Sequence, residues 1–346
     1  MRTLVISDLH LGDRGHRDVL RLPAVRDRMV ERLADVDRLV LLGDTVELMH
    51  RHAERAMAVA SPVLRAVGRA LGPDGEVIIV PGNHDAPLIR GWAYAQGVRL
   101  EPSHAVPATA SPALHQLVSW LAPARTRVSY PGVWLGERIW ATHGHYLDHH
   151  LIPDAPIGLL RPPRRDATAS SPRDYEHLHH LGRRSRESLP ARLAARPVAT
   201  VVEGAAEQVR VLPALLLNTG LAPVTAKLLD VQMRRAALPA MSRVVARLGI
   251  GADWVLFGHV HRRGPIGEEA WPAGAARLVN SGAWLYERLL LDRATGPHPY
   301  WPGGAVLVQD GQAPQSVGLL DELSAEELRV PSARREDEVA VSEARG

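Results

Sequence analysis

Asp, His and Asn residues recur along this chain directly after short apolar runs. The first run, Leu4 to Ile6, is followed closely by Asp8 and His10. Because side chains alternate along an extended backbone, these two side chains point the same way and could hold one cation together. An Asp-x-His triplet on its own is more often a surface turn than a metal site. The polar residues later in the chain are therefore needed to distinguish a metal site from a surface turn.

Four later segments repeat the arrangement of an apolar, strand-like run that ends in polar side chains. They place Asp44 after Leu39–Leu42, Asn83, His84 and Asp85 after Val77–Val80, His143 after Arg138–Thr142, and His259 and His261 after Ala252–Phe257. Helical patterns occupy intervening segments at Val19–Leu33, His52–Leu71 and Pro112–Leu121. Alternating strands and helices predict a sheet with helices on its faces, so we expect the polar groups after the first three strands to converge at one edge.

In order and spacing, five blocks resemble the signature motifs of the calcineurin-like metallophosphoesterases. The blocks are Asp8-x-His10, Gly43-Asp44, Gly82-Asn83-His84-Asp85, a Gly-His segment with His143, and Gly258-His259-x-His261. The resemblance covers roughly residues 1–146 and 252–309. It implies a mixed α/β fold, an αββα sandwich of two mixed β-sheets flanked by helices. It also implies a metal-dependent phosphohydrolase.

The resemblance assigns a role to each of these residues. Asp8, His10 and His261 would bind one metal ion, Asn83, His143 and His259 would bind a second, and Asp44 would bridge the two. His84 would face the phosphate and stabilise or protonate the leaving oxygen, and Asp85 would orient its ring. Nitrogen and oxygen ligands without thiolate suit two divalent ions of Mn, Fe or Zn, with manganese as the first expectation.

Two such ions about 3.5–4 Å apart hold a phosphate oxygen and lower the pKa of a bridging water. The expected reaction is therefore attack of a metal-activated hydroxide on a phosphodiester, phosphomonoester or pyrophosphate bond.

Several of these residues also have structural interpretations. Asp44 could be a helix N-cap, and Asn83 could be an ordinary turn residue. In the histidine-rich segment 143–150, His145 could replace His143 as the ligand, although strand placement favours His143. Asp148 could accept a hydrogen bond from a ligand, but a solvated loop carboxylate is the simpler interpretation. Trp284 is more simply a core residue than part of a cleft.

The substrate class has less support in the sequence. The blocks around Asp8, Asp44 and His143 are similar to the branch that contains UDP-2,3-diacylglucosamine pyrophosphatases, but many of those enzymes have Arg at the position of His84. We therefore rank a small phosphodiester, nucleotide or pyrophosphate above the sugar lipid. Nucleic acid is the runner-up, since the sequence pI of 9.6 permits polyanion binding but no aromatic-interleaved basic motif supports it. A non-catalytic metal-binding scaffold is disfavoured because no ligand is missing.

Composition limits the classes of protein to consider. With 346 residues and 46% hydrophobic content, the chain can bury a large core. It has no cysteine, which excludes disulfides and thiolate ligands. The chain opens directly into a strand-like run and holds no stretch of 18 apolar residues, so we expect a cytoplasmic protein.

The sequence divides into three parts. We expect residues 1–150 and 251–320 to form the metallophosphoesterase domain, and residues 321–346, with net charge −4 from 4 basic and 8 acidic residues, to form a loosely held or disordered tail.

Residues 151–250 would be a largely helical insertion of net charge +7, from 15 basic and 8 acidic residues. Helical patterns occur at 209–217 and 224–233, and an apolar stripe consists of Leu238, Met241, Val244, Val245 and Leu248. The insertion either packs against the core or is a lid that selects bulky or lipidic substrates at a membrane surface.

Overall fold

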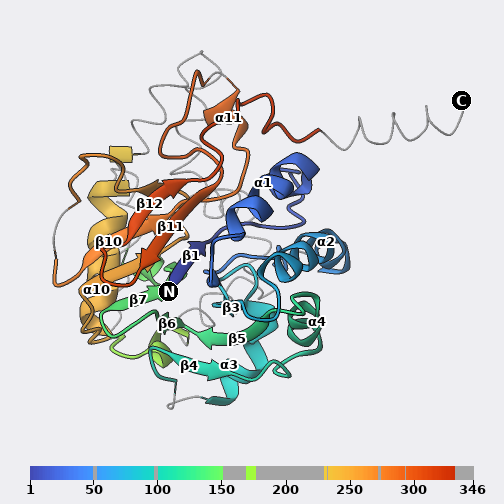
Figure 1. The fold of residues 1–346 in the computed structure, drawn as a ribbon. Coiled ribbons are helices and arrows are strands. Elements are labelled where there is room, and N and C mark those ends of the chain that lie inside the picture. Colours follow the sequence, from blue (N-terminus) through green and yellow to red (C-terminus); the bar gives the residue numbers. More distant parts are fainter. Residues whose placement is uncertain are drawn as a thin grey trace, which may run out of the picture.

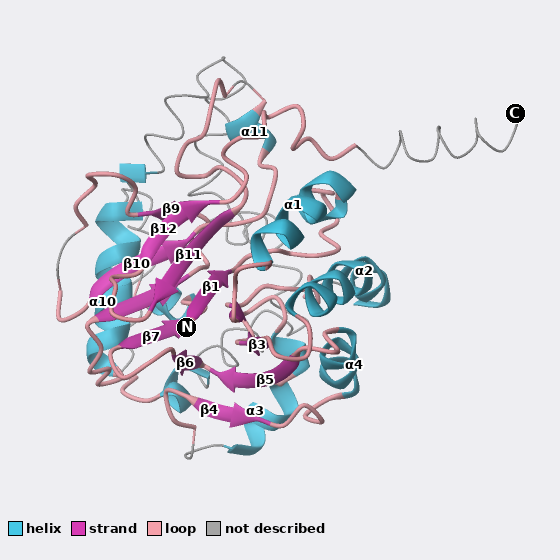
Figure 2. Cartoon of the chain, viewed as in Figure 1, coloured by secondary structure: helices cyan, strands magenta, loops and turns pink. Residues whose placement is uncertain are grey.

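Two β-sheets lie face to face, and helices cover their outer faces (Figures 1 and 2). This arrangement is seen in a computed structural model that describes residues 1–49, 53–96, 100–150, 169–176, 230–231, 233–271, 274–292 and 294–331. The predicted mixed α/β class, an αββα sandwich, is confirmed.

The larger sheet has seven strands in the order β12-β11-β1-β2-β3-β5-β4. Its parallel strands are β1 (Arg2–Ile6), β2 (Arg38–Leu41), β3 (Glu76–Ile79) and β5 (Arg125–Tyr130). The strands that pair antiparallel are β4 (His104–Val106), β11 (Gly304–Gln309) and β12 (Gln315–Gly318). Because β1, β2 and β3 are parallel, the polar residues that follow them emerge at one edge of the sheet.

The smaller sheet has five strands in the order β6-β7-β8-β10-β9. They are β6 (Gly132–Trp134), β7 (Ile139–Thr142), β8 (Trp254–Phe257), β9 (Arg263–Gly264) and β10 (Arg277–Ser281). β7, β8 and β10 run parallel. His143 and His259 therefore leave this sheet at the same edge.

Both faces of each sheet are buried, and side chains alternate between two cores. In β1, Leu4 and Ile6 join the core beneath the helices, whereas Val5 lies between the sheets. In β8, Phe257 packs on the helical side and Leu256 packs between the sheets. This double burial explains why the strands are continuous apolar runs in the sequence.

Helices form the two outer layers, on opposite sides of the sheets in Figure 1. The larger sheet is covered by α1 (Pro23–Leu33), α2 (Ala53–Leu71) and α4 (Pro112–Trp120), and the smaller sheet by the π-helical turn η6 (Met233–Ala237) and α10 (Leu238–Arg247). The short elements are η1 (Val19–Arg21), η2 (Ala86–Leu88), α3 (Arg90–Gln96), η4 (His145–His149) and α11 (Arg288–Leu291). Among the helices of the described ranges, none has the length and apolar character needed to cross a bilayer.

The apolar stripe predicted in the insertion is the inner face of α10 together with Leu248, the residue that follows the helix. Its five residues are all buried and pack against the smaller sheet. This helix is therefore a layer of the sandwich and not a lid. The predicted helices at 209–217 and 224–233 lie outside the described residues, except for positions 230, 231 and 233, and the lid hypothesis remains a prediction for that part of the chain.

The first part of the predicted acidic tail packs onto the domain. Leu328 and Val330 are buried in the core beneath the helices, and Arg329 donates to Asp292 Oδ1 over 2.9 Å. The packed domain therefore continues past the predicted limit at residue 320. Residues 332–346 lie outside the described residues.

Met241→Ala tests whether α10 is an integral layer. Because Met241 is fully buried, we expect the free energy of unfolding to fall by about 2–5 kcal/mol in urea titrations. The neighbouring control Ser242→Ala, whose hydroxyl bonds only to Leu238 O within the helix, should change it by no more than about 0.5 kcal/mol. Equal free energies of unfolding for wild type and Met241→Ala would show that the packing of α10 on the sheet does not stabilise the protein.

Candidate metal centre

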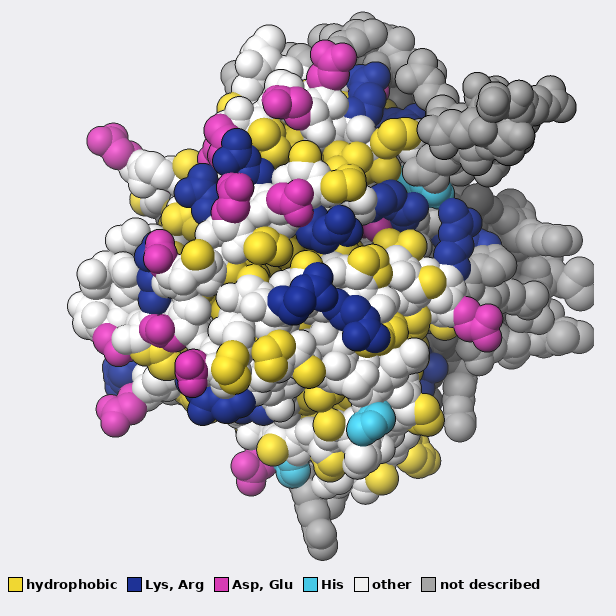
Figure 3. Space-filling view, turned by 45° about the vertical axis from the view of Figure 1, so that its right-hand side comes forward, with side chains coloured by type: hydrophobic (Ala, Val, Ile, Leu, Met, Phe, Trp, Pro, Cys, Tyr) yellow, Lys and Arg dark blue, Asp and Glu magenta, His cyan; other side chains and the backbone are white. Residues whose placement is uncertain are grey.

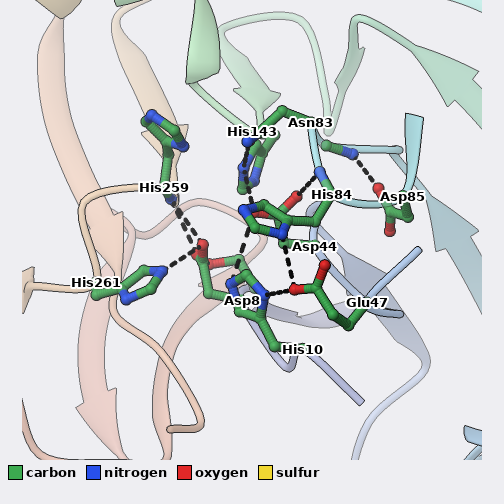
Figure 4. A network of polar contacts seen from close by, with 12 residues as sticks. Asp8, His10, Asp44, Glu47, Asn83, His84, Asp85, His143, His259 and His261 are labelled. Atoms are coloured by element: carbon green, nitrogen blue, oxygen red, sulfur yellow. Dashed lines mark hydrogen bonds and ion pairs between the residues drawn. The ribbon is translucent and has the colours of Figure 1, made fainter. Parts of the chain in front are cut away.

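The residues predicted to bind metal lie together at the edge where the two sheets meet (Figure 4). Asp and His side chains form three close groups, in each of which the ligand atoms lie within 4.8 Å of one another. The groups are Asp8, His10 and His261; His10, Asp44 and His84; and Asp44, His143 and His259. His10 and Asp44 each belong to two groups, so the three groups form one continuous cluster.

The backbone at these residues is held in an unusual conformation. Among the described non-glycine residues, the φ angle is positive at Asp8, His10, Asp44, His259 and His261 (44° to 68°), and otherwise only at His16. Such conformations cost about 1–3 kcal/mol each and persist only where the surrounding structure imposes them. The fold thus concentrates its backbone strain at the cluster.

Three glycines that precede site residues lie so close to other site side chains that no Cβ atom would fit. A Cβ atom on Gly43 would lie 2.3 Å from Nδ1 of His143, and one on Gly82 would lie 2.3 Å from Oδ1 of Asp44. A Cβ atom on Gly258 would lie 2.5 Å from Oδ2 of Asp8. Each glycine lets one strand end pass directly against a side chain of another strand end.

His143 is oriented so that one ring nitrogen faces the cluster. Its Nδ1–H donates to Leu42 O over 3.0 Å. Its Nε2 lies 3.1 Å from both Oδ2 of Asp44 and Oδ1 of Asn83. Burial lowers the pKa of His143, but Asp44 outweighs it and raises the pKa to about 10. In the protein alone a proton therefore sits among these acceptor atoms, in a position that suits a metal ion.

His10 has the same arrangement on the other side of Asp44. Its Nδ1 lies 3.1 Å from Oε2 of Glu47. Its Nε2 is buried, has no hydrogen-bond partner among the described residues, and lies 3.6 Å from Oδ2 of Asp44. A buried polar atom without a partner costs about 1–3 kcal/mol, which a cation between His10 and Asp44 would relieve. Oδ2 of Asp44 thus lies between two histidine nitrogens, as a bridging ligand would.

Asp8 completes the cluster from the first strand. Oδ2 accepts hydrogen bonds from Ser7 Oγ and, over 2.9 Å, from His259 N. Oδ1 lies 3.2 Å from Nε2 of His261. Burial raises the pKa of Asp8, but His261 and His143 lower it to about 2. The buried carboxylate is therefore an anion at neutral pH.

His84 lies at the rim of the cluster, with 30% of its side chain exposed. Its Nδ1 is 2.7 Å from Oε2 of Glu47. Burial lowers the pKa of His84, but Asp44 and Glu47 raise it to about 9. The ring is therefore a cationic hydrogen-bond donor that solvent can reach.

The prediction that Asp85 orients the His84 ring is corrected by the structure. The buried Asp85 carboxylate accepts from Thr45 N over 2.8 Å and from Gly82 N, so it holds two backbone segments of the site. Glu47 makes the contact to the ring instead. Burial and the charge of Asp44 raise the pKa of Asp85 to about 6.

Two acidic residues that the sequence did not select contact the site. Glu47 is buried and bonds to both His10 and His84; the available signal was an acidic residue inside the apolar segment 46–49. Oδ1 of Asp148 lies 2.9 Å from Nε2 of His259, although 47% of the Asp148 side chain is exposed. Asp148 thus contacts a candidate ligand and is not only a solvated loop carboxylate.

The structure also distinguishes between the alternatives stated for His145, Asp44 and Trp284. His145 lies outside the three groups, with its Nε2 3.4 Å from the hydroxyl of Tyr130. The carboxylate of Asp44 accepts from His84 N over 2.8 Å, so it does not cap a helix. Trp284 is fully buried and donates to Gly304 O over 3.1 Å, which makes it a core residue.

Residues 1–202 match the family model described as calcineurin-like phosphoesterase. No curated protein matches the chain.

Gly43→Ala tests the close approach at His143. The added Cβ must displace the His143 ring, so we expect Mn²⁺ affinity in calorimetric titration to fall about 10-fold or more. Gly72→Ala is the matched control, because Gly72 also has a positive φ of 66° but nothing within 4 Å of its added Cβ. It should lose about 1–2 kcal/mol of stability and keep its metal affinity. Unchanged affinity in Gly43→Ala would refute the assignment.

Proposed function

Because this chain belongs to the calcineurin-like phosphoesterase family, whose members are metal-dependent phosphohydrolases, we propose that its Asp, His and Asn cluster holds two divalent metal ions and hydrolyses a phosphodiester or pyrophosphate bond. The observation that carries the two-ion proposal is the position of Asp44 Oδ2, 3.6 Å from Nε2 of His10 and 3.1 Å from Nε2 of His143. One carboxylate oxygen between two ligand nitrogens fits a bridge between two ions.

The proposed ligands divide into two sets that share Asp44. The first ion is held by Asp8, His10 and His261, and the second by Asn83, His143 and His259. This set of nitrogen and oxygen donors fits Mn, Fe or Zn, and we choose Mn²⁺ for the tests. When bound, two such ions supply Lewis acidity and lower the pKa of a water between them.

The protein's own groups orient these ligands. Leu42 O and Glu47 each bond to Nδ1 of a ligand histidine, which leaves Nε2 of His143 and of His10 directed to the ions. Fixing the ring nitrogen in this way raises metal affinity, because no rotation or tautomer change is needed on binding.

His84 is the proposed acid toward the leaving group. Glu47 holds its Nδ1, so Nε2 is the nitrogen that can donate to a substrate oxygen. The charged ring would stabilise the negative charge that develops on that oxygen and then transfer a proton to it.

A small diester, nucleotide or pyrophosphate remains the proposed substrate. His84 stands where many sugar-lipid pyrophosphatases have Arg, and in the structure it contacts Glu47. On the face shown in Figure 3, basic side chains are mixed with acidic and apolar ones. That surface gives no support to a nucleic-acid substrate, which would favour a continuous basic strip.

Asp44→Asn tests the bridge. Because one oxygen is proposed to serve both ions, we expect loss of bound metal and at least a 10²-fold fall in turnover of a chromogenic phosphodiester with Mn²⁺, roughly the effect of removing a main electrostatic group. Bound metal is measured by mass spectrometry after desalting. Asp253→Asn is the control, since Asp253 pairs with Arg138 at the surface. Two tightly bound ions and normal turnover in Asp44→Asn would contradict the proposal.

His84→Ala separates acid catalysis from metal binding. We expect both ions to remain and turnover to fall by about 10² or more. The fall should be larger for an alkyl leaving group than for p-nitrophenolate, because a weakly basic leaving group needs little help from an acid. A rate that falls only because metal is lost would instead make His84 a ligand.

A further inference from the structure

Two polar residues at the end of β10 lie next to the cluster but are not among its proposed ligands. Asn280 and Ser281 are fully buried and come from the smaller sheet, whereas Ser7 and Asp8 follow β1 in the larger sheet. Polar side chains buried this deeply are retained where they form hydrogen bonds. The hydrogen-bond partners of Asn280 and Ser281 therefore indicate the roles of these two residues.

Ser281 reaches Asp8 through the hydroxyl of Ser7. Oγ of Ser281 lies 2.6 Å from Oγ of Ser7, and Ser7 Oγ donates to Oδ2 of Asp8. A hydroxyl has one hydrogen, so when Ser7 donates to Asp8, the bond between the two hydroxyls uses the hydrogen of Ser281, whose other acceptor, Phe257 O, is farther away at 3.2 Å. The bonds then run in one direction from Ser281 through Ser7 to Asp8, and each strengthens the next.

This chain of bonds decides which oxygen of Asp8 faces the cluster. Oδ2 accepts from Ser7 and also from His259 N, which lies nearer to Oδ2 (2.9 Å) than to Oδ1 (3.2 Å). Oδ1 is 3.2 Å from Nε2 of His261 and is left for a cation. Without Ser281, the Ser7 hydroxyl can turn to its other acceptor, Gly282 O at 3.2 Å, and release Oδ2.

Asn280 holds the turn that carries His259 and His261. Its Nδ2 donates to Gly258 O over 2.6 Å, and its Oδ1 accepts from Gly282 N over 2.9 Å. The two histidines have φ angles of 68° and 56°, a conformation that needs support from outside the turn. The Asn280 amide supplies such support from the neighbouring strand.

We propose that Ser281 and Asn280 are positioning residues for the ion held by Asp8, His10 and His261: Ser281 ties the smaller sheet to Asp8 through Ser7, and Asn280 holds the turn that carries His261. This inference rests on the two-ion site proposed above. The ligands of that ion come from both sheets, so its affinity depends on their relative position. The hydroxyl of Ser281 acts mainly on Asp8, a ligand of that ion, whereas the amide of Asn280 acts on the turn with ligands for both ions.

The test is calorimetric titration of the metal-free full-length chain with Mn²⁺. Wild type should bind two ions. In Ser281→Ala one of the two affinities should fall by about 10- to 100-fold, the usual effect of removing a group that orients a ligand, and the other should fall less, because Asp8 contacts His259 only through its backbone N–H. The control is Ser129→Ala, which removes a buried hydroxyl that donates to Gly132 O over 2.6 Å and has no bond to the cluster. It should keep both affinities.

The outcomes separate the two proposals. Wild type that binds fewer than two ions would refute the two-ion site itself. Folded Ser281→Ala with both wild-type affinities would overturn the positioning role. Should Ser281→Ala fail to fold, Asn280→Ala provides the measurement, because it removes the donor to Gly258 O and the acceptor for Gly282 N without adding a charge. Weakened Mn²⁺ binding in this variant supports the inference, and unchanged binding overturns it.

Discussion

Two carboxylates, Asp8 and Asp44, are buried within the cluster, and the surrounding fold must compensate their charge. Both are almost completely inaccessible, and a buried charge costs several kcal/mol, as an order of magnitude, unless it is compensated. Their partners are backbone N–H groups, one hydroxyl and histidines, and neither forms an ion pair with Lys or Arg of the described ranges. The protein therefore depends on protons or metal ions for the compensating positive charge.

The sandwich makes this arrangement possible by bringing the ends of two sheets to one edge. Asp8, His10, Asp44 and Asn83 follow strands of the larger sheet, and His143, His259 and His261 follow strands of the smaller one. To bring these seven side chains together, the chain adopts positive φ angles at five of the residues and has glycines where no Cβ atom would fit. Bonds between the sheets, such as that of Ser7 to Ser281, keep the two halves together.

Much of this could be predicted from the sequence, because strand ends and helical stripes are local patterns. The positions chosen as ligands lie in or against the cluster, and the stripe from Leu238 to Leu248 is the buried face of α10 together with the residue that follows it. The contact between Glu47 and His84 could not be predicted, since it joins segments after two different strands and depends on their register. The family resemblance assigned this role to Asp85 instead. The burial of Leu328 and Val330 could not be predicted either, because the sequence around them is acidic and poor in apolar residues.

Anomalous diffraction from crystals of the full chain grown with Mn²⁺ would show whether two cations share Asp44. We expect two anomalous peaks about 3.5–4 Å apart, one on each side of the Asp44 carboxylate, with Asp8 and His261 at the first and Asn83 and His143 at the second. A single peak, or peaks that do not contact Asp44, would show that Asp44 does not bridge two ions.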